Sequence, residues 1–452
     1  MRLENKYLYA VLVLTSGLSL LLYVFIGYYV ERTETNTLLI SYGSLFILFT
    51  IIMCLRITPL IILTLGVIFR LVLIISFPEL SQDFYRFFWD GNLQLMNINP
   101  YLYSPNDLII KNDLFYLAND LFFGMGELSN SNFSNYPPIS QWSYIIASYF
   151  GENNLDYSVL VLRIIIILFE LGTFYVFYKL LNFLKLPLNR IGWYFLNPLV
   201  IIELTGNLHG EGIMIFFFLL GVLFLFQNRT VKSSIMMAFS ISSKLVTLIL
   251  IPLFLKKLGL KKSLYYFFLI TAFFSLLWIP YMDENFYMNY LQTIQLWFNR
   301  FEFNASIYYI IREIGFYFKG YNIINTFGKI APFILMSGIL FFTFLQKNNS
   351  LNQVLKNQLL LLSFYFFIAT TVHPWYIVSL VALCIFTPYF YPIVWSATIF
   401  LSYASYSSSE VNEYPLILIL EYLIVFSVII FETFGGENKM FKAFAKNSTL
   451  SK

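Results

Sequence analysis

The chain has 452 residues, of which 59% are hydrophobic, 20% aromatic and only 12% charged. Soluble globular domains carry about 25% charged residues, so this composition excludes an ordinary soluble domain and indicates a polytopic membrane protein. The formal net charge of +4 is too small to suggest a nucleic-acid partner.

Three apolar stretches open the chain, and each is long enough to cross a bilayer, which takes about 20 residues. They cover residues 7–29, 38–55 and 57–77. We therefore expect residues 1–77 to form three N-terminal transmembrane helices. Basic residues near the N-terminus favour a cytoplasmic start, so the third helix would deliver the chain to the outer side.

The first long polar stretch, residues 78–138, follows these helices and is predicted to be a large outer catalytic loop with amphipathic helices. A helix capped by Ser81 would place Asp83, Arg86 and Asp90 on one face, at i, i+3 and i+7. Aromatic residues cover much of the remaining surface, so we expect this helix to lie at a membrane surface with its aromatic side in the headgroups. The alternative is a loop helix whose charges are merely solvated.

Residues 139–434 are predicted to form the transmembrane core, with a second outer loop at residues 280–320. The segment at 139–150 is too short to cross and is predicted to be a re-entrant or surface helix. Basic residues in the short loops and in the tail at 435–452 place both termini in the cytoplasm. The expected fold is an all-α helical bundle with about 12 to 14 crossings.

A polar sequence, SISSK, interrupts an apolar segment at residues 240–244. Both ends of that segment carry cytoplasmic signals, so a pair of half-helices that breaks near Ser242 fits better than one straight span. Lys244 lies at this break, and an ionisable group inside a membrane is a functional candidate. The alternative is that Lys244 extends towards the inner surface.

The only two histidines of the chain, His209 and His373, both fall at predicted outer helix ends. Each has a structural alternative: His373 precedes a proline that ends a helix, and His209 lies in a tight glycine turn. A zinc site from His209, Glu211 and one aspartate is conceivable, although H-x-E alone is a weak signal. No Walker A, G-x-G-x-x-G, H-E-x-x-H or G-x-S-x-G motif occurs, so a soluble nucleotide donor is not expected.

Six segments in chain order share the pattern of one family. They are SQDFYRFFWDGNLQLMNINPYLYSP at 81–105, NYPPISQ at 135–141, NPLVIIELTGNLHGEG at 197–212, SSKLVTLILIP at 242–252, FNASIYY at 303–309 and HPWY at 373–376. Together they resemble the bacterial GT-C superfamily of polyprenyl-phosphate-dependent glycosyltransferases, usually called mannosyltransferases. The resemblance runs from about residue 56 to residue 405, most of the chain.

The resemblance implies a multi-pass enzyme of the bacterial plasma (inner) membrane. It would move a hexose, mannose favoured, from polyprenyl phosphate to a glycan, lipid or polypeptide acceptor on the outer face, with inversion. Asp83 matches the loop carboxylate that serves this superfamily as general base. Gln82 stands where the family often has a second aspartate, which puts a metal-bound version in doubt; a divalent metal ion stays an alternative.

The expected substrate-binding residues share a predicted place on the outer face or at a membrane break. They are Arg86, Asp90, Asn99, Tyr101, Tyr136, His209, Glu211, Lys244 and His373. Among them, Arg86, Lys244 and His373 supply cationic donors that suit a lipid-phosphate leaving group. We also expect the first outer loop to meet the turn at residues 206–212, which would bring Asp83 near His209.

Three rival functions stay open at this point. A transporter or lipid flippase would share the hydropathy and broken helices, but it predicts internal repeats, which are not evident, and charges strung through the membrane rather than gathered on one face. A non-catalytic scaffold has no need of a large acid-bearing loop. The closest rival keeps the fold but transfers another sugar or joins preassembled glycans.

Overall fold

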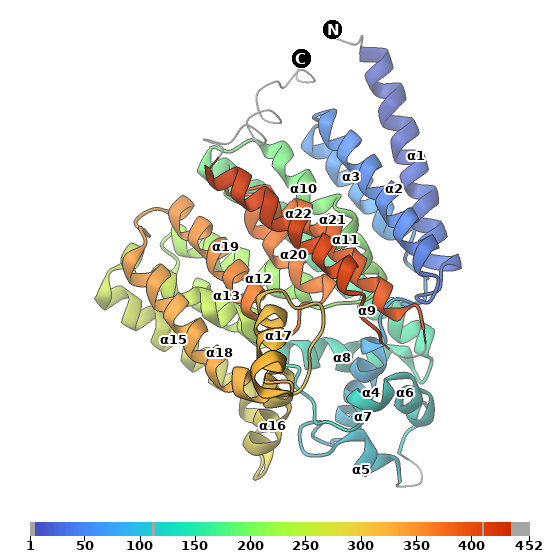
Figure 1. The fold of residues 1–452 in the computed structure, drawn as a ribbon, viewed down its shortest axis with the longest axis vertical. Helices are drawn as coiled ribbons and strands as arrows, with labels where there is room; N and C mark the ends of the chain where they lie inside the picture. Colours follow the sequence, from blue (N-terminus) through green and yellow to red (C-terminus); the bar gives the residue numbers. More distant parts are fainter. Residues whose placement is uncertain (1–4, 111–113, 409–410, 435–452) are drawn as a thin grey trace. The chain divides into compact units, whose positions relative to one another are not determined.

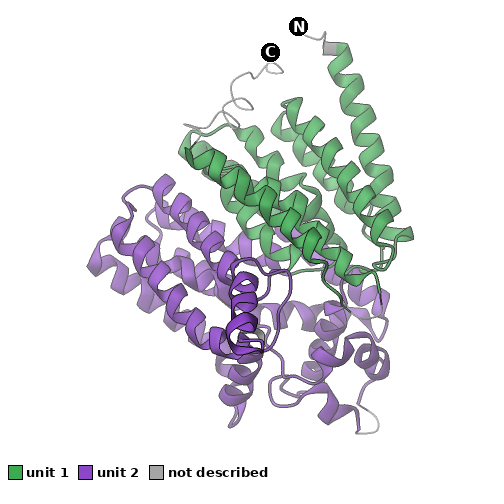
Figure 2. Cartoon of the chain, viewed as in Figure 1, with its two compact units in different colours: residues 1–80, 170–209, 373–452 green, residues 81–169, 210–372 purple. Residues whose placement is uncertain are grey.

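The computed structural model describes residues 5–110, 114–408 and 411–434, and the chain divides into two compact units (Figure 2). Unit 1 comprises residues 1–80, 170–209 and 373–452, and unit 2 comprises residues 81–169 and 210–372. Helices form both units (Figure 1). Within the described ranges the only β-type pairing is an isolated bridge between Phe303 and Thr371. The predicted all-α fold is therefore confirmed.

Unit 1 holds the two ends of the described chain and a middle segment. Its helices are α1 (Asn5–Tyr29), α2 (Thr35–Cys54), α3 (Pro59–Leu71), α10 (Gly192–Phe195), α11 (Pro198–Val200), a π-helix (Ile201–Gly206), α20 (Pro374–Cys384), α21 (Tyr391–Thr398), a 3-10 helix (Ile399–Tyr406) and α22 (Pro415–Phe434). Helix α9 (Leu155–Leu184) belongs to both units.

Unit 2 begins with the short helices of the predicted outer loop and continues with longer apolar ones. They are α4 (Asp83–Leu95), α5 (Pro105–Ile109), α6 (Ala118–Gly124), α7 (Gly126–Asn130), α8 (Pro138–Gly151), α12 (Glu211–Phe226), α13 (Thr230–Ser243), a 3-10 helix (Leu245–Phe254), α14 (Leu255–Leu258), α15 (Leu260–Trp278), α16 (Phe286–Asn299), α17 (Ile307–Lys319), α18 (Ile324–Leu340) and α19 (Leu351–Ile368).

Six helices of the described residues are long and apolar enough to cross a membrane. They are Lys6–Tyr29, Thr35–Cys54, Leu155–Leu184, Leu260–Tyr281, Ile324–Leu345 and Pro415–Phe434. A seventh arises if Pro198–Gly206 and Glu211–Phe226 count as one bent span. This count is lower than the 12 to 14 expected crossings, because several expected spans are shorter helices such as the 13-residue Pro59–Leu71. The multi-pass membrane character of the chain is confirmed.

The two compact units do not follow the predicted division of the chain into membrane-spanning and outer segments. The assignment of residues 1–77 and 139–434 to the membrane, and of residues 78–138 and 280–320 to the outer side, stays a prediction. The predicted cytoplasmic tail, residues 435–452, lies outside the described residues.

Helix α4 packs its aromatic side into unit 2, so the prediction that this side lies in lipid headgroups is wrong. Its aromatic residues Phe84, Phe87, Phe88 and Trp89 are buried. Phe87 stacks on Tyr144 of α8 with ring centroids 4.5 Å apart and planes within 3°. Gly91 permits this approach, because a Cβ at that position would lie 2.5 Å from the carbonyl oxygen of Tyr144.

The predicted break near Ser242 is confirmed. Helix α13 ends at Ser243, Lys244 has extended backbone with φ −151° and ψ 129°, and a 3-10 helix follows from Leu245. The hydroxyl of Ser240 donates to the carbonyl of Met214 at 2.9 Å and lies 2.9 Å from the hydroxyl of Thr247. Serine and threonine side chains thus bond groups on both sides of the break, which stabilises it in an apolar setting.

Candidate active site

Asp83 is the first residue of α4 and is half-buried. Gln82, and not the predicted Ser81, is the N-cap residue, and its side chain makes no capping hydrogen bond. Ser81 still fixes the approach to the helix, because its hydroxyl accepts from the backbone N–H of Asp83 at 3.3 Å. The positive end of the helix dipole favours the ionised form of a carboxylate at this position.

Asp90, two turns along the same helix, is fully buried. Its Oδ1 accepts from Nε of Arg86 at 2.8 Å, and its Oδ2 accepts from Nε2 of Gln141 at 2.9 Å. The hydroxyl of Ser134 donates to the same Oδ2. Asp90 is therefore bonded on both carboxylate oxygens by groups of the protein, as a buried charge requires.

Arg86 is buried and fastens the segment before Ser134 to α4. Its Nη1 donates to the carbonyl oxygens of Ser129 at 2.6 Å and Asn132 at 2.9 Å. Its Nη2 is buried and has no hydrogen-bond partner among the residues that the structure describes. One nitrogen of this guanidinium thus retains the capacity to donate to a ligand.

Two tyrosines lie among these charges. Burial raises the pKa of Tyr144 well above its ordinary value of 10.0, and the negative charges of Asp90, Asp83 and Glu211 raise it further. Burial also raises the pKa of Tyr136 well above that value, and Asp83 is the next largest cause. Both phenols therefore stay neutral at physiological pH, and three carboxylates of unit 2 act on one ring.

Glu211 and Lys244 form an ion pair between the first residue of α12 and the break after α13. The Glu211 side chain is 3% exposed and that of Lys244 is 23% exposed. The second oxygen of Glu211, Oε2, is buried and has no hydrogen-bond partner among the described residues. Lys244 is thus held by a carboxylate of its own unit, and it reaches the surface only in part.

Asn99 and Tyr101 connect the first predicted outer loop to the second. The side-chain amide of Asn99 donates to the carbonyl oxygen of Tyr281 at 3.0 Å and to Oδ2 of Asp283 at 2.6 Å. The hydroxyl of Tyr101 donates to the carbonyl oxygen of Tyr136. Tyr101 also belongs to a buried aromatic cluster with Trp278, Tyr281 and Tyr290. Tyr101 therefore supports the segment that carries Tyr136, and Asn99 fixes its own loop to Tyr281 and Asp283.

In unit 1, the two histidines come together on one indole. The His209 ring stacks on Trp375 at 3.7 Å with an interplanar angle of 17°, and the His373 ring stacks on Trp375 at 4.4 Å and 6°. Nε2 of His209 lies 3.7 Å from Oε2 of Glu203. The other oxygen of Glu203 accepts from the hydroxyl of Tyr403 at 2.8 Å. The structure therefore assembles a second polar cluster from residues far apart in sequence.

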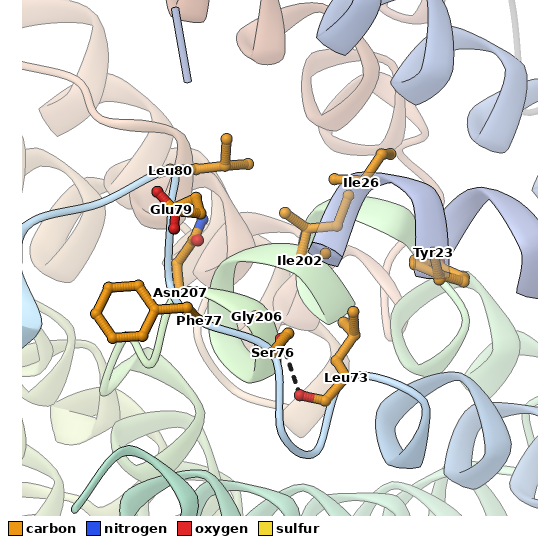
Figure 3. A pocket seen from close by; sticks show the side chains of 11 residues that line it. Tyr23, Ile26, Leu73, Ser76, Phe77, Glu79, Leu80, Ile202, Gly206 and Asn207 are labelled. Atoms are coloured by element: carbon orange, nitrogen blue, oxygen red, sulfur yellow. Dashed lines mark hydrogen bonds between the residues drawn. The ribbon is translucent and has the colours of Figure 1, made fainter. Parts of the chain in front are cut away.

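A pocket of unit 1 is lined in part by Asn207, whose amide bonds Glu203 of this cluster (Figure 3). Glu79 and Asn207 lie at one end together with Phe77 and Leu80, and Tyr23, Ile26 and Leu73 lie at the other. The amide of Asn207 donates to Oε2 of Glu203 at 3.0 Å, and this carboxylate also faces His209. The wall of the pocket includes the end of the π-helix Ile201–Gly206, and π-helical turns are frequent at functional sites.

The predicted site residues therefore fall into two groups. Unit 2 holds Asp83, Arg86, Asp90, Asn99, Tyr101, Tyr136, Glu211 and Lys244, and unit 1 holds His209 and His373. Because Asp83 and His209 belong to different units, their predicted meeting stays a prediction. No group of three or more histidine, cysteine, aspartate or glutamate side chains that could hold a metal ion is found in the described part of the chain, so the conceivable zinc site gains no support.

Several residues that the sequence reasoning missed lie on or before α8, and another follows His373. They are Ser134, Ser140, Gln141, Tyr144 and Trp375. A signal was present for α8, since serines, a glutamine and a tyrosine recur at helical spacing within an otherwise apolar segment. Trp375 lies in the HPWY segment at 373–376, and Ser140 and Gln141 lie in the NYPPISQ segment at 135–141, so the resemblance covered these three residues although none was singled out.

Residues 7–258 match the family described as alpha-(1->6)-mannopyranosyltransferase, N-terminal domain, and this range is more than half of the 452-residue chain. No curated protein matches the chain. The matched range includes α4, α8, the Glu211 turn and the Lys244 break. The protein is thus a multi-pass membrane glycosyltransferase that belongs to the alpha-(1->6)-mannopyranosyltransferase family.

Proposed function

We propose that the protein transfers mannose from a polyprenyl-phosphate carrier to a hydroxyl of a glycan acceptor at the outer face of a bacterial plasma membrane. The family name supports mannose as the sugar and a 6-hydroxyl as the accepting group. The apolar helices and the resemblance to lipid-dependent transferases support a lipid-linked donor. The reaction inverts the anomeric centre, so an alpha product requires a donor with the opposite, beta, linkage.

Asp83 is the proposed general base. The acceptor oxygen attacks the anomeric carbon, the bond from that carbon to the phosphate oxygen breaks, and the acceptor proton moves to the Asp83 carboxylate. Attack from the side opposite the leaving phosphate inverts the configuration. The position of Asp83 supports this role, because it is half-buried at the first residue of α4, where the helix dipole favours a carboxylate.

Lys244 is the proposed contact of the donor phosphate, with Arg86 of the same unit as a further cation. Nη2 of Arg86 is a buried donor without a partner among the described residues. Lys244 is partly exposed and its charge already balances that of Glu211, so an arriving phosphate would share the ammonium group with that carboxylate. Charge-assisted hydrogen bonds of this kind stabilise a phosphate as its negative charge increases in the transition state.

One observation carries the proposal. Within unit 2, the first turn of α8 bonds Asp90 of α4 through Gln141 and the carbonyl oxygen of Ser243, the residue before Lys244, through Ser140. Lys244 is paired with Glu211 and Arg86 with Asp90, so two cations accompany these two acids. Acids gathered beside cations in this way supply both the base and the phosphate contacts that a base-assisted transfer from a phosphate carrier needs.

The test is a comparison of donors with the purified protein in lipid nanodiscs. Beta-linked mannosyl-phosphoryl-polyprenol, its glucosyl counterpart and a nucleotide-linked mannose are each offered with an alkyl alpha-mannoside as acceptor. We expect transfer from the mannosyl lipid alone, and an alpha-(1->6) product by NMR. Transfer from the nucleotide sugar would contradict the lipid donor, a beta product would contradict inversion, and preference for the glucosyl lipid would contradict mannose.

A further inference from the structure

We propose that Ser140 and Gln141, neighbours in the first turn of α8, are positioning residues. Together they fix Lys244, on the side of the sugar donor, relative to helix α4 with Asp83, on the side of the acceptor. The inference rests on the proposed function, in which Lys244 contacts the donor phosphate and Asp83 serves the acceptor. Each acts through another residue, Gln141 through Asp90 of α4 and Ser140 through the peptide group before Lys244.

Gln141 is fully buried, and both its amide nitrogen and its amide oxygen form hydrogen bonds, to α4 and to the loop before α8. Its Nε2 donates to Oδ2 of Asp90 at 2.9 Å and to the hydroxyl of Ser134 at 2.8 Å. Its Oε1 accepts from Nε2 of Gln94 at 2.7 Å. Asp90 and Gln94 lie one turn apart on α4, so one side chain holds two successive turns of the helix that begins with Asp83.

Ser140 is also buried, but it bonds the other side of the site. Its hydroxyl donates to the carbonyl oxygen of Ser243 at 2.8 Å. Ser243 is the last residue of α13, where carbonyl groups lack a partner within the helix. The bond therefore fixes the peptide that leads directly into Lys244, and with it the direction in which the lysine side chain leaves the break.

The backbone of α8 makes this connection rigid. Pro138 is the first residue of the helix and follows Pro137, so the backbone angles of the first turn are restricted. Consecutive residues on a helix point about 100° apart. Ser140 and Gln141 therefore face different neighbours from one rigid turn. A shift of α8 would move Lys244 and the α4 acids together, and a change at either residue should disturb only one side.

Ser140→Ala tests the donor side, with Ser143→Ala as its matched control. Ser143 lies on the same helix and is also buried, but its hydroxyl bonds only carbonyl groups of α8 itself, those of Ile139 and Ser140. With mannosyl-phosphoryl-polyprenol as donor, Ser140→Ala should raise the donor KM about two- to tenfold, the effect of losing one hydrogen bond, with kcat nearly unchanged. Ser140→Thr keeps the hydroxyl and should restore the donor KM.

Gln141→Glu tests the acceptor side, because it keeps the shape of the side chain and replaces the donor that faces Asp90 by a second carboxylate. We expect kcat to fall about tenfold or more with the donor KM unchanged. The ratio of mutant to wild-type kcat should rise as pH falls, since the introduced carboxyl group, once protonated, again donates to Asp90. A deficit that is the same at every pH would contradict the assigned role of the amide.

Lys244→Ala separates failure of this inference from failure of the proposed function. If Lys244→Ala leaves the donor KM unchanged, the donor assignment itself is wrong. If Lys244→Ala raises the donor KM while Ser140→Ala behaves like Ser143→Ala, the positioning role is wrong and the donor assignment stands. Equal loss of kcat and donor affinity in both Ser140→Ala and Gln141→Glu would indicate general damage to α8 and would also overturn the inference.

Discussion

Substituting Asp90 by asparagine separates structure from chemistry on α4. Asp90 is fully buried and accepts from Arg86 at 2.8 Å, from Gln141 at 2.9 Å and from Ser134. Asparagine at this position would turn its own NH2 group, which can only donate, towards one of the three groups that donate to Asp90. It would also leave the Arg86 guanidinium without its buried counter-charge. Removing one partner of a buried ion pair typically costs about 3–5 kcal/mol of folding free energy.

A cost of about 3–5 kcal/mol corresponds to a roughly 10²- to 10⁴-fold change in the folding equilibrium, a large part of the stability of a typical protein. Asp83→Asn should cost less than Asp90→Asn, because Asp83 is only half-buried and its interaction with the helix dipole is worth about 0.3–1 kcal/mol. Thermal unfolding in detergent, followed by intrinsic fluorescence, should therefore show a clear drop in Tm for Asp90→Asn and a smaller one for Asp83→Asn.

The reasoning would be refuted by the opposite pattern. If Asp90→Asn unfolds like wild type but is inactive, and Asp83→Asn turns over at a near-normal rate, Asp90 is the base and its hydrogen bonds serve catalysis. Activity is to be expressed per folded molecule, so that loss of protein is not read as loss of chemistry.

Three further predictions concern packing, pH and a buried charge pair. Gly91→Ala should destabilise the protein by about 1–3 kcal/mol, because the alanine Cβ would lie 2.5 Å from the α8 backbone. Gly17→Ala is the control and should be tolerated, because a Cβ there meets nothing within 4 Å. The prediction is checked by the Tm values of the two variants. Because the pKa of Tyr144 is raised, the folded protein keeps a phenol proton that the unfolded chain loses near pH 10. The contribution of Tyr144 to the free energy of unfolding is therefore complete below pH 10 and decreases as the pH rises further. The Tm of wild type should thus decrease above pH 10, and that of Tyr144→Phe should decrease less. Arg70→Met should cost about 3–5 kcal/mol by leaving Glu170, 2.9 Å from the guanidinium, buried without its charge partner, and adding Glu170→Gln should recover part of the loss in a double-mutant cycle.

Features that depend on nearby residues could be predicted from the sequence. The SISSK interruption predicted the break beside Lys244, because polar residues and a charge inside an apolar segment favour a broken helix. The spacing of Arg86 and Asp90 predicted a shared helix face, and the structure pairs them. The N-cap was misplaced by one residue, since Ser81 bonds the backbone of Asp83 from outside the helix.

Features that depend on distant partners could not be predicted in this way. Glu211 and Lys244 are 33 positions apart, and only the fold shows that they pair. The aromatic side of α4 suits lipid headgroups and a protein core equally well in sequence, and the close approach at Gly91 decides for the core. The stacking of both histidines on Trp375 likewise brings His209 to His373 and Trp375, which lie more than 160 positions further along the chain.

The central claim is that Asp83 is the base in a transfer from a polyprenyl-phosphate donor. Its most direct test is a single-turnover measurement with radiolabelled mannosyl-phosphoryl-polyprenol bound to wild type and to Asp83→Asn in nanodiscs, with donor Kd determined on the same samples. The account predicts an unchanged donor Kd and a rate of transfer that falls about 10²- to 10⁴-fold. Near-normal transfer by Asp83→Asn at the same donor occupancy would contradict it.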